Sequence, residues 1–376
     1  MVRVLLRAVV ALLLCAAAGC SAPAPADGAE RDVRRAVAAW PQRPPGIPFD
    51  SFGYEVTSVR RDGDRAVAAA ELRYRLAGYD AAPATAAREV ELTSAGGAWR
   101  VTAERPAPGA PAQPWDQGPV TVVHGTHALV LGTGQDRALL EAVADTVDGA
   151  VPAAGSAWPR PWAGRVVVLV PGSLDAMAAL LGRPPSQYAG TAAVTTAATG
   201  AGAGPADRVV VNPQAYAQLS GAGRRIVLTH EVTHVATRAA TTERTPLWLS
   251  EGFADWAAYR GSADDVPARA APALARAVRA GQLPPALPAD EAFGFGGEAE
   301  ASARAYEGAW LACRLIAARW GEAALVALYE AAGREPLPEA LRRTLGTDLP
   351  GLTQAWRAEL RTVLSADDAQ DADRDQ

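Results

Sequence analysis

The most informative stretch of the sequence is residues 229–234, which read Thr-His-Glu-Val-Thr-His. They lie in a segment, 222–237, whose apolar residues recur at helical spacing. On a helix, His230 and His234 fall on one face, one turn apart, because side chains four positions apart lie above one another. Their imidazole nitrogens can therefore reach one zinc ion at about 2.0–2.1 Å each. Glu231 projects from the same turn, where it could take a proton from a zinc-bound water.

A second expected helix, a few residues downstream, offers the remaining ligand. Thr245 is suited to be its N-cap, and Pro246 suits its first position. A catalytic zinc site needs a third protein ligand and one position left for water. Glu251 can be that ligand, and Asp255, one turn further on, can orient a ligand from behind. Gly252 would let the two helices approach closely.

The two histidines also have a plainer interpretation. They could be solvated side chains on an exposed helix, with an unrelated glutamate between them. The chain has only four His in 376 residues, and composition alone gives this spacing in roughly one such chain in several hundred. The segment around Glu251 favours the metal site over this alternative.

Together these segments resemble the gluzincin metallopeptidases, in particular the aminopeptidase N-like branch and the wider peptidase MA-like group. Those enzymes carry H-E-x-x-H followed by a W-L-x-E-G-F-A block, matched here by residues 248–254. The resemblance covers about residues 165–330. It implies a thermolysin-like zincin fold, zinc held by the two histidines and Glu251, and hydrolysis of peptide bonds with Glu231 as the general base.

A further segment, Tyr306-Glu307-Gly308, resembles the Y-E-K-G motif of aminopeptidase-like enzymes. The resemblance implies that Tyr306 donates a hydrogen bond to the oxyanion of the transition state. This chain departs from the motif because Gly308-Ala309 replaces the usual Lys-Gly pair. The alternative is that Tyr306 is a half-buried tyrosine on a helix with no part in catalysis.

Substrate preference should differ from that of the aminopeptidases. Their G-x-M-E-N segment, which binds a free amino group, is not found, and the corresponding region 192–212 contains no Glu. An endopeptidase or a different exopeptidase is therefore expected. By analogy, the strand at 208–212 would be the sheet edge that pairs with an extended substrate.

Around this block the chain passes from strands to helices, which indicates an α+β fold. A small β-rich domain, 31–115, is similar in pattern to NTF2-like or cystatin-like domains. A gluzincin-like metallopeptidase domain, 116–364, follows, with a mixed sheet and a mostly helical C-terminal half. The expected helices are 30–40, 136–148, 173–181, 222–237, 246–260, 266–280, 302–320, 322–332, 337–345 and 350–364, and the expected strands lie within 50–104, 120–132, 165–171, 192–199 and 208–212.

The N-terminus has the features of an export signal. Arg3 and Arg7 precede a short apolar run that is too short to span a bilayer. Residues 17–20, Ala-Ala-Gly-Cys, resemble the lipobox of bacterial lipoproteins. The resemblance implies a signal peptide at 1–20, a lipid on Cys20, and anchoring at the outer face of the bacterial cytoplasmic membrane. The alternative is ordinary secretion.

The ends of the chain and its composition complete the expectations. A flexible tether is expected at 21–30 and a disordered acidic tail at 365–376. Hydrophobic residues make up 49% of the chain and charged residues 20%, as in globular proteins. The net charge of −5 provides no basic surface, so nucleic acid is not an expected partner. The expected partners are a peptide or protein substrate and, through Cys20, a membrane.

Two functions remain open at this point. The first is a zinc-dependent peptidase of the cell envelope. The second is a catalytically silent, peptidase-like lipoprotein that serves as a binding or envelope-structural module. The sequence leaves the oligomeric state undetermined.

Overall fold

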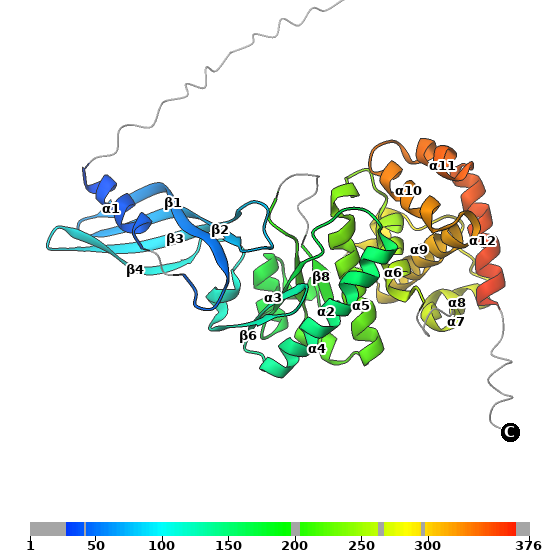
Figure 1. Ribbon diagram of the computed structural model, residues 1–376, viewed down its shortest axis with the longest axis horizontal. Helices are drawn as coiled ribbons and strands as arrows, with labels where there is room; N and C mark the ends of the chain where they lie inside the picture. Colours follow the sequence, from blue (N-terminus) through cyan, green and yellow to red (C-terminus); the bar gives the residue numbers. More distant parts are fainter. Residues whose placement is uncertain (1–27, 41–42, 197–203, 262–266, 295–297, 366–376) are drawn as a thin grey trace, which may run out of the picture.

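The computed structural model describes residues 28–40, 43–196, 204–261, 267–294 and 298–365. Within these residues the fold is mixed α/β, with an N-terminal antiparallel sheet, a second sheet, and a mostly helical C-terminal half (Figure 1). The segment 1–20, expected to be a signal peptide ending at Cys20, lies outside the described residues, as does the expected tail beyond Ser365. No described helix is both long enough and apolar enough to cross a membrane.

The N-terminal part is one helix and a four-stranded meander. Its elements are α1 (Gly28–Ala38), β1 (Phe49–Asp62), β2 (Arg65–Leu76), β3 (Ala84–Ala95) and β4 (Ala98–Pro106). The β1–β2 turn contains Gly63 with φ of 59°, a backbone conformation that favours glycine. Because α1 begins at Gly28, the expected tether at 21–30 is too long by three residues. Glu30 pairs with Arg34 one turn later, which supports the first turn of the helix.

The second sheet has five strands in the order β5-β6-β7-β9-β8. They are β5 (Val120–His124), β6 (Ala128–Thr133), β7 (Val166–Val170), β9 (Arg208–Val211) and β8 (Ala193–Thr195). β6, β7 and β9 are parallel, and the outer strands β5 and β8 are antiparallel to their neighbours. The expectation that the strand at 208–212 forms the edge is therefore wrong, because β8 pairs outside it.

The two faces of the second sheet have different covers. Val130 and Val168 belong to the apolar cluster that contains the helices, whereas Leu129 and Leu169 belong to a separate cluster on the other face. That second cluster includes Leu72, Tyr74 and Leu76 of β2 together with Met177 of α3. The N-terminal sheet thus buries one face of the sheet that lies beside the candidate site, and the helices bury the other.

The helical elements complete the fold. They are α2 (Arg137–Ala157), α3 (Leu174–Leu181), α4 (Pro213–Ala217), α5 (Gly221–Thr237), α6 (Leu247–Tyr259), α7 (Pro267–Ala270), α8 (Pro272–Arg279), α9 (Ala299–Trp320), α10 (Glu322–Ala332), α11 (Leu337–Leu345) and α12 (Leu349–Leu364), with short 3-10 turns η1 (Pro114–Gln117), η2 (Pro185–Gln187), η3 (Arg238–Ala240) and η4 (Asp290–Phe293). The helices predicted for 322–332, 337–345 and 350–364 are confirmed to within one residue at each end.

Two helices that contain or adjoin a proline differ from the expected ones. α2 continues nine residues past the expected end at 148 and contains Pro152. The helix is retained because Ala150, Val151 and Ala154 are buried beyond the predicted end, and this burial outweighs the lost backbone hydrogen bond. In contrast, Pro272 divides the helix expected at 266–280 into α7 and α8, and residue 266 lies outside the described part of the chain.

Candidate metal centre

Helix α5 presents its two histidines away from the core. Ser220 caps its N-terminus by accepting a hydrogen bond from the Gly223 backbone N–H. Leu228 and Val232 are fully buried in the apolar cluster beneath the helix. This burial fixes the rotation of α5, so that His230 and His234 point toward α6.

Helix α6 begins one residue later than the sequence indicates. Its N-cap is Pro246, and the Thr245 hydroxyl accepts a hydrogen bond from the Thr242 backbone N–H instead of capping α6. The expected role of Thr245 is therefore wrong. No side chain near the start of α6 caps the Leu247 backbone N–H. This N–H instead donates to Asp290 Oδ1 of η4 at 2.8 Å, so a carboxylate distant in sequence replaces the local cap.

Gly252 allows a close helix contact, but with a different helix from the one expected. A Cβ atom at Gly252 would lie 2.3 Å from the Ala309 carbonyl oxygen of α9. The backbones of α6 and α9 can approach this closely only because glycine has no side chain. The contact joins α6 to α9 at the residue that follows the candidate ligand Glu251.

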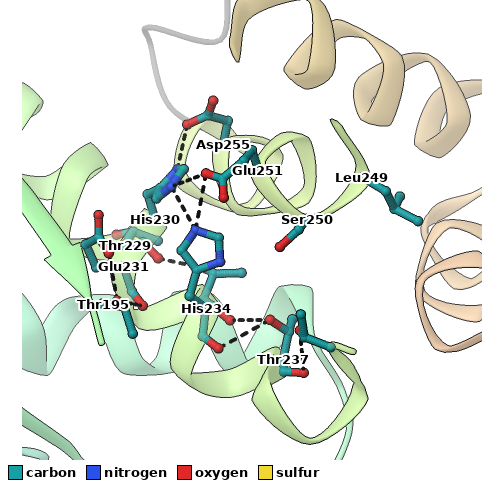
Figure 2. Close-up of polar contacts among 12 residues, drawn as sticks. Thr195, Thr229, His230, Glu231, His234, Thr237, Leu249, Ser250, Glu251 and Asp255 are labelled. Atoms are coloured by element: carbon teal, nitrogen blue, oxygen red, sulfur yellow. Dashed lines mark hydrogen bonds and ion pairs between the residues drawn. The ribbon is translucent and has the colours of Figure 1, made fainter. Parts of the chain in front are cut away.

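The three expected ligand residues converge at one point between α5 and α6 (Figure 2). His230 Nε2 and His234 Nε2 are 3.0 Å apart. Glu251 Oε2 lies 3.3 Å from His230 Nε2 and 3.4 Å from His234 Nε2. All three side chains are largely buried, with 13–17% of their surface exposed. Among the described residues, this is the one group of three His, Cys, Asp or Glu that could hold a metal ion.

Asp255 holds one of the histidines from behind. Its Oδ1 lies 2.7 Å from His230 Nδ1. An N–H on Nδ1 that donates to this carboxylate leaves Nε2 free to face the other two residues. The expected role for Asp255, to orient a histidine, is therefore consistent with its position.

The charges of the candidate ligands are coupled to one another. Burial opposes ionisation of Glu251, but the charge of His234 and hydrogen bonds from both histidines hold the pKa of its carboxyl well below the usual range. Burial likewise opposes protonation of His230, yet Asp255 and Glu251 hold the pKa of this imidazole well above its usual value. The cluster thus combines an ionised carboxylate with an imidazole that holds its proton strongly.

Glu231 is buried beside the cluster and contacts the edge of the sheet. The hydroxyl of Thr195, in β8, lies 2.7 Å from Glu231 Oε2 and 3.1 Å from the Glu231 carbonyl oxygen. The sequence predicts a strand at Thr195 but indicates no role for its side chain. No local pattern could have indicated the contact, because the two residues are 36 positions apart.

Tyr306 lies next to the cluster. Its ring centre is 6.5 Å from that of His230 and 5.1 Å from that of Phe293. Burial, and then the nearby carboxylates of Glu251 and Asp255, raise the pKa of its phenol well above the usual range. The hydroxyl therefore stays protonated and can act as a hydrogen-bond donor.

A buried polar network beneath the cluster links the two ligand-bearing helices. The hydroxyl of Tyr329, in α10, lies 2.8 Å from the Thr241 hydroxyl and 3.3 Å from both the Thr237 and Ser250 hydroxyls. Thr237 belongs to α5, and Ser250 precedes Glu251 in α6. Tyr329 is fully buried, so its contacts fix the two helices relative to each other. No sequence pattern indicates this network, because its residues come from separate segments of the chain.

Comparisons with known proteins add no assignment. No protein-family model matches the chain, and no curated protein matches it. The interpretation of the site therefore depends on its geometry.

Proposed function

We propose that this protein is a zinc-dependent peptidase of the cell envelope. In this proposal, residues 116–364 form a thermolysin-like zincin domain, and 31–115 form an NTF2-like or cystatin-like domain. His230, His234 and Glu251 would hold the zinc ion. The observation that carries the proposal is the spacing of their three ligand atoms.

The spacing can be compared with the requirements of a metal site. Ligand atoms about 2.1 Å from a tetrahedral zinc ion lie about 3.4 Å from one another. The three distances here are 3.0, 3.3 and 3.4 Å. Two imidazoles and one carboxylate are also a ligand set of catalytic zinc sites, which keep a fourth position for water or substrate. The residues therefore fit the ion.

Two further side chains have the chemistry that peptide hydrolysis requires. Zinc, when bound, supplies Lewis acidity that polarises a carbonyl group and acidifies water. Glu231 would accept the proton of the attacking water and later give it to the leaving amine. Its carboxylate is oriented by the Thr195 hydroxyl at 2.7 Å. Tyr306, protonated at neutral pH, would donate to the oxyanion.

Among the described strands, β8 lies at the edge of the second sheet, a position that supports binding of an extended substrate. The Thr196 N–H bonds to the Arg208 carbonyl, and the Asn212 N–H bonds to the Ala192 carbonyl. In an antiparallel ladder, alternate residues point outward, so the backbone groups of Ala193 and Thr195 face away from β9. They would pair with a peptide strand next to Glu231. A main-chain mode of binding suits an endopeptidase or a nonspecific exopeptidase more than a strict aminopeptidase.

The location is part of the proposal. Export and a lipid on Cys20 would place the enzyme at the outer face of the bacterial cytoplasmic membrane. A Cys20→Ala variant would then be released from the membrane fraction, whereas wild type would partition with it. Equal partitioning of the two would support simple secretion.

Metal analysis and a peptide-library screen test the central claim. The full-length protein should contain one zinc per chain and cleave peptides, with the products identified by mass spectrometry. Glu231→Gln should retain zinc and lose activity, because the amide cannot accept the proton. Zinc without cleavage of any peptide would favour a catalytically silent binding module. Absence of zinc binding would refute the proposal.

A further inference from the structure

We infer that Asp80 and Arg208 form a clamp through which the N-terminal sheet holds the catalytic edge of the second sheet in position. The inference rests on the proposed function, because it concerns the substrate edge and the general base of that site. It assigns a positioning role to the loop between β2 and β3, far from the candidate ligands in sequence.

The Asp80 carboxylate is fully buried and bonded on both oxygens. Arg208 donates from Nη1 to Oδ1 at 2.8 Å and from Nη2 to Oδ2 at 2.9 Å. The Leu76 and Ala206 backbone N–H groups donate to the same carboxylate. A two-pronged contact of this kind fixes direction as well as distance. Asp80 therefore joins the end of β2 to the start of β9.

Arg208 connects the clamp to the edge strand. Its backbone N–H donates to the Thr196 hydroxyl at 2.9 Å, and its carbonyl accepts from the Thr196 N–H at 2.8 Å. Thr195, the preceding residue, contacts both the carboxylate and the carbonyl of Glu231. A continuous series of polar contacts thus runs from the β2–β3 loop to the general base.

The same segment is tied to the ligand-bearing helix at a second point. Asp207 Oδ2 accepts from Arg238 Nε, just after the end of α5, at 2.7 Å. β9 is thus held by the N-terminal sheet at Asp80 and by the end of α5 at Arg238. Among the described strands, β8 pairs with β9 alone, so its position depends in part on these two attachments of β9.

Breaking the clamp should lower both the catalytic activity and the stability of the protein. Removing one member of a buried ion pair leaves the other charge without a partner in the interior. Arg208 would then turn toward solvent and draw the start of β9 with it. Displacing β8 would disturb both the edge that pairs with substrate and the Thr195 contact that orients Glu231.

An Asp80→Asn variant tests the clamp, and Asp148→Asn is the matched control. Asp148 also accepts backbone N–H groups, those of Thr126, His127 and Ala128, but at β5 and β6, away from β8. Amide hydrogen exchange by NMR would follow the Thr196 and Arg208 N–H groups. Asp80→Asn should speed their exchange at least ~10-fold, and Asp148→Asn should leave it unchanged.

Kinetics of the zinc-loaded enzyme give the second measurement. Asp80→Asn should lower kcat/KM about 100-fold, through a lower kcat and a higher KM, with zinc content unchanged. If Asp80→Asn does not fold, Arg208→Lys retains a charge beside Asp80, gives up the two-pronged contact, and should show the same changes with smaller size. Faster exchange in a protein whose wild type cleaves no peptide would refute the proposed function but not the clamp. Unchanged exchange, or an active variant with wild-type kinetics, would overturn the clamp.

Discussion

A methyl group added at Gly252 should separate two helices and weaken the metal site beside them. The added Cβ would lie 2.3 Å from the Ala309 carbonyl oxygen and 2.5 Å from the Ala309 carbonyl carbon. Ordinary contacts of a Cβ begin near 3.4 Å, so α6 and α9 must move apart by about 1 Å. The obstacle is helix backbone, which cannot rotate away as a side chain could.

The expected size of the effect follows from two opposing contributions. Overpacking a core costs about 1–3 kcal/mol, and a clash with backbone belongs at the upper end of that range. Alanine is a better helix former than glycine by about 1 kcal/mol. The free energy of unfolding of Gly252→Ala should therefore fall by about 2 kcal/mol. Because Glu251 moves with Gly252, and ligand distances tolerate only about 0.2 Å, the zinc affinity should fall about 100-fold.

Gly149→Ala is the control for this variant. Gly149 lies in α2, and a Cβ there would meet no atom within 4 Å. This substitution should raise the free energy of unfolding by about 0.5–1 kcal/mol and leave zinc affinity unchanged. Urea denaturation followed by tryptophan fluorescence and chelator competition for zinc would measure both quantities. If Gly252→Ala behaved like Gly149→Ala in both assays, the packing argument would be refuted.

Three other substitutions test single contacts at the site. Asp255→Asn should weaken zinc binding about 10–100-fold in chelator competition, because it weakens the hydrogen bond that orients His230; wild-type affinity would exclude that role. Tyr306→Phe should lower kcat about 100-fold with little change in KM, and an unchanged kcat would leave Tyr306 as a packing residue. Tyr329→Phe should lower the free energy of unfolding by about 1–3 kcal/mol, because three hydroxyls, two of them buried, lose a partner; unchanged stability in urea would show that the network contributes nothing.

The sequence indicates those parts of the site whose residues lie close together in the chain. His230 and His234 are one helical turn apart, so their shared face follows from helix geometry alone. Asp255 follows Glu251 by the same interval. Their helices were predictable because each has a long apolar face. The meeting of the two helices was expected from the need for a third ligand and from the resemblance, and in the structure their ligand atoms lie within 4.8 Å of one another.

The contacts that the sequence did not indicate join distant segments. Thr195 and Glu231 are 36 positions apart, and Tyr329 is 79 positions from Ser250. No periodicity carries information over such distances. The edge strand shows the same difficulty. β9 follows β8 in the chain, but β9 and not β8 pairs with β7, which leaves β8 at the outer position. The sequence does not decide this order, because either strand of the β8–β9 pair could have been placed next to β7.

The sequence indicates that both faces of the second sheet need a cover, but it does not indicate that the N-terminal sheet covers one of them. β7 is a run of five buried residues, 166–170, and such a strand needs cover on both faces. Helices that follow in the sequence account for one face. The other cover, Leu72 and Leu76 of β2, lies about 90 positions earlier and beyond a Pro-rich segment that reads as a linker. A Pro-rich linker does not exclude a shared core, because the linker only connects the two sheets along the chain, whereas their buried side chains pack against each other in the fold. The sheet beside the candidate site therefore depends on residues before 115 for its core as well as for the Asp80 contact.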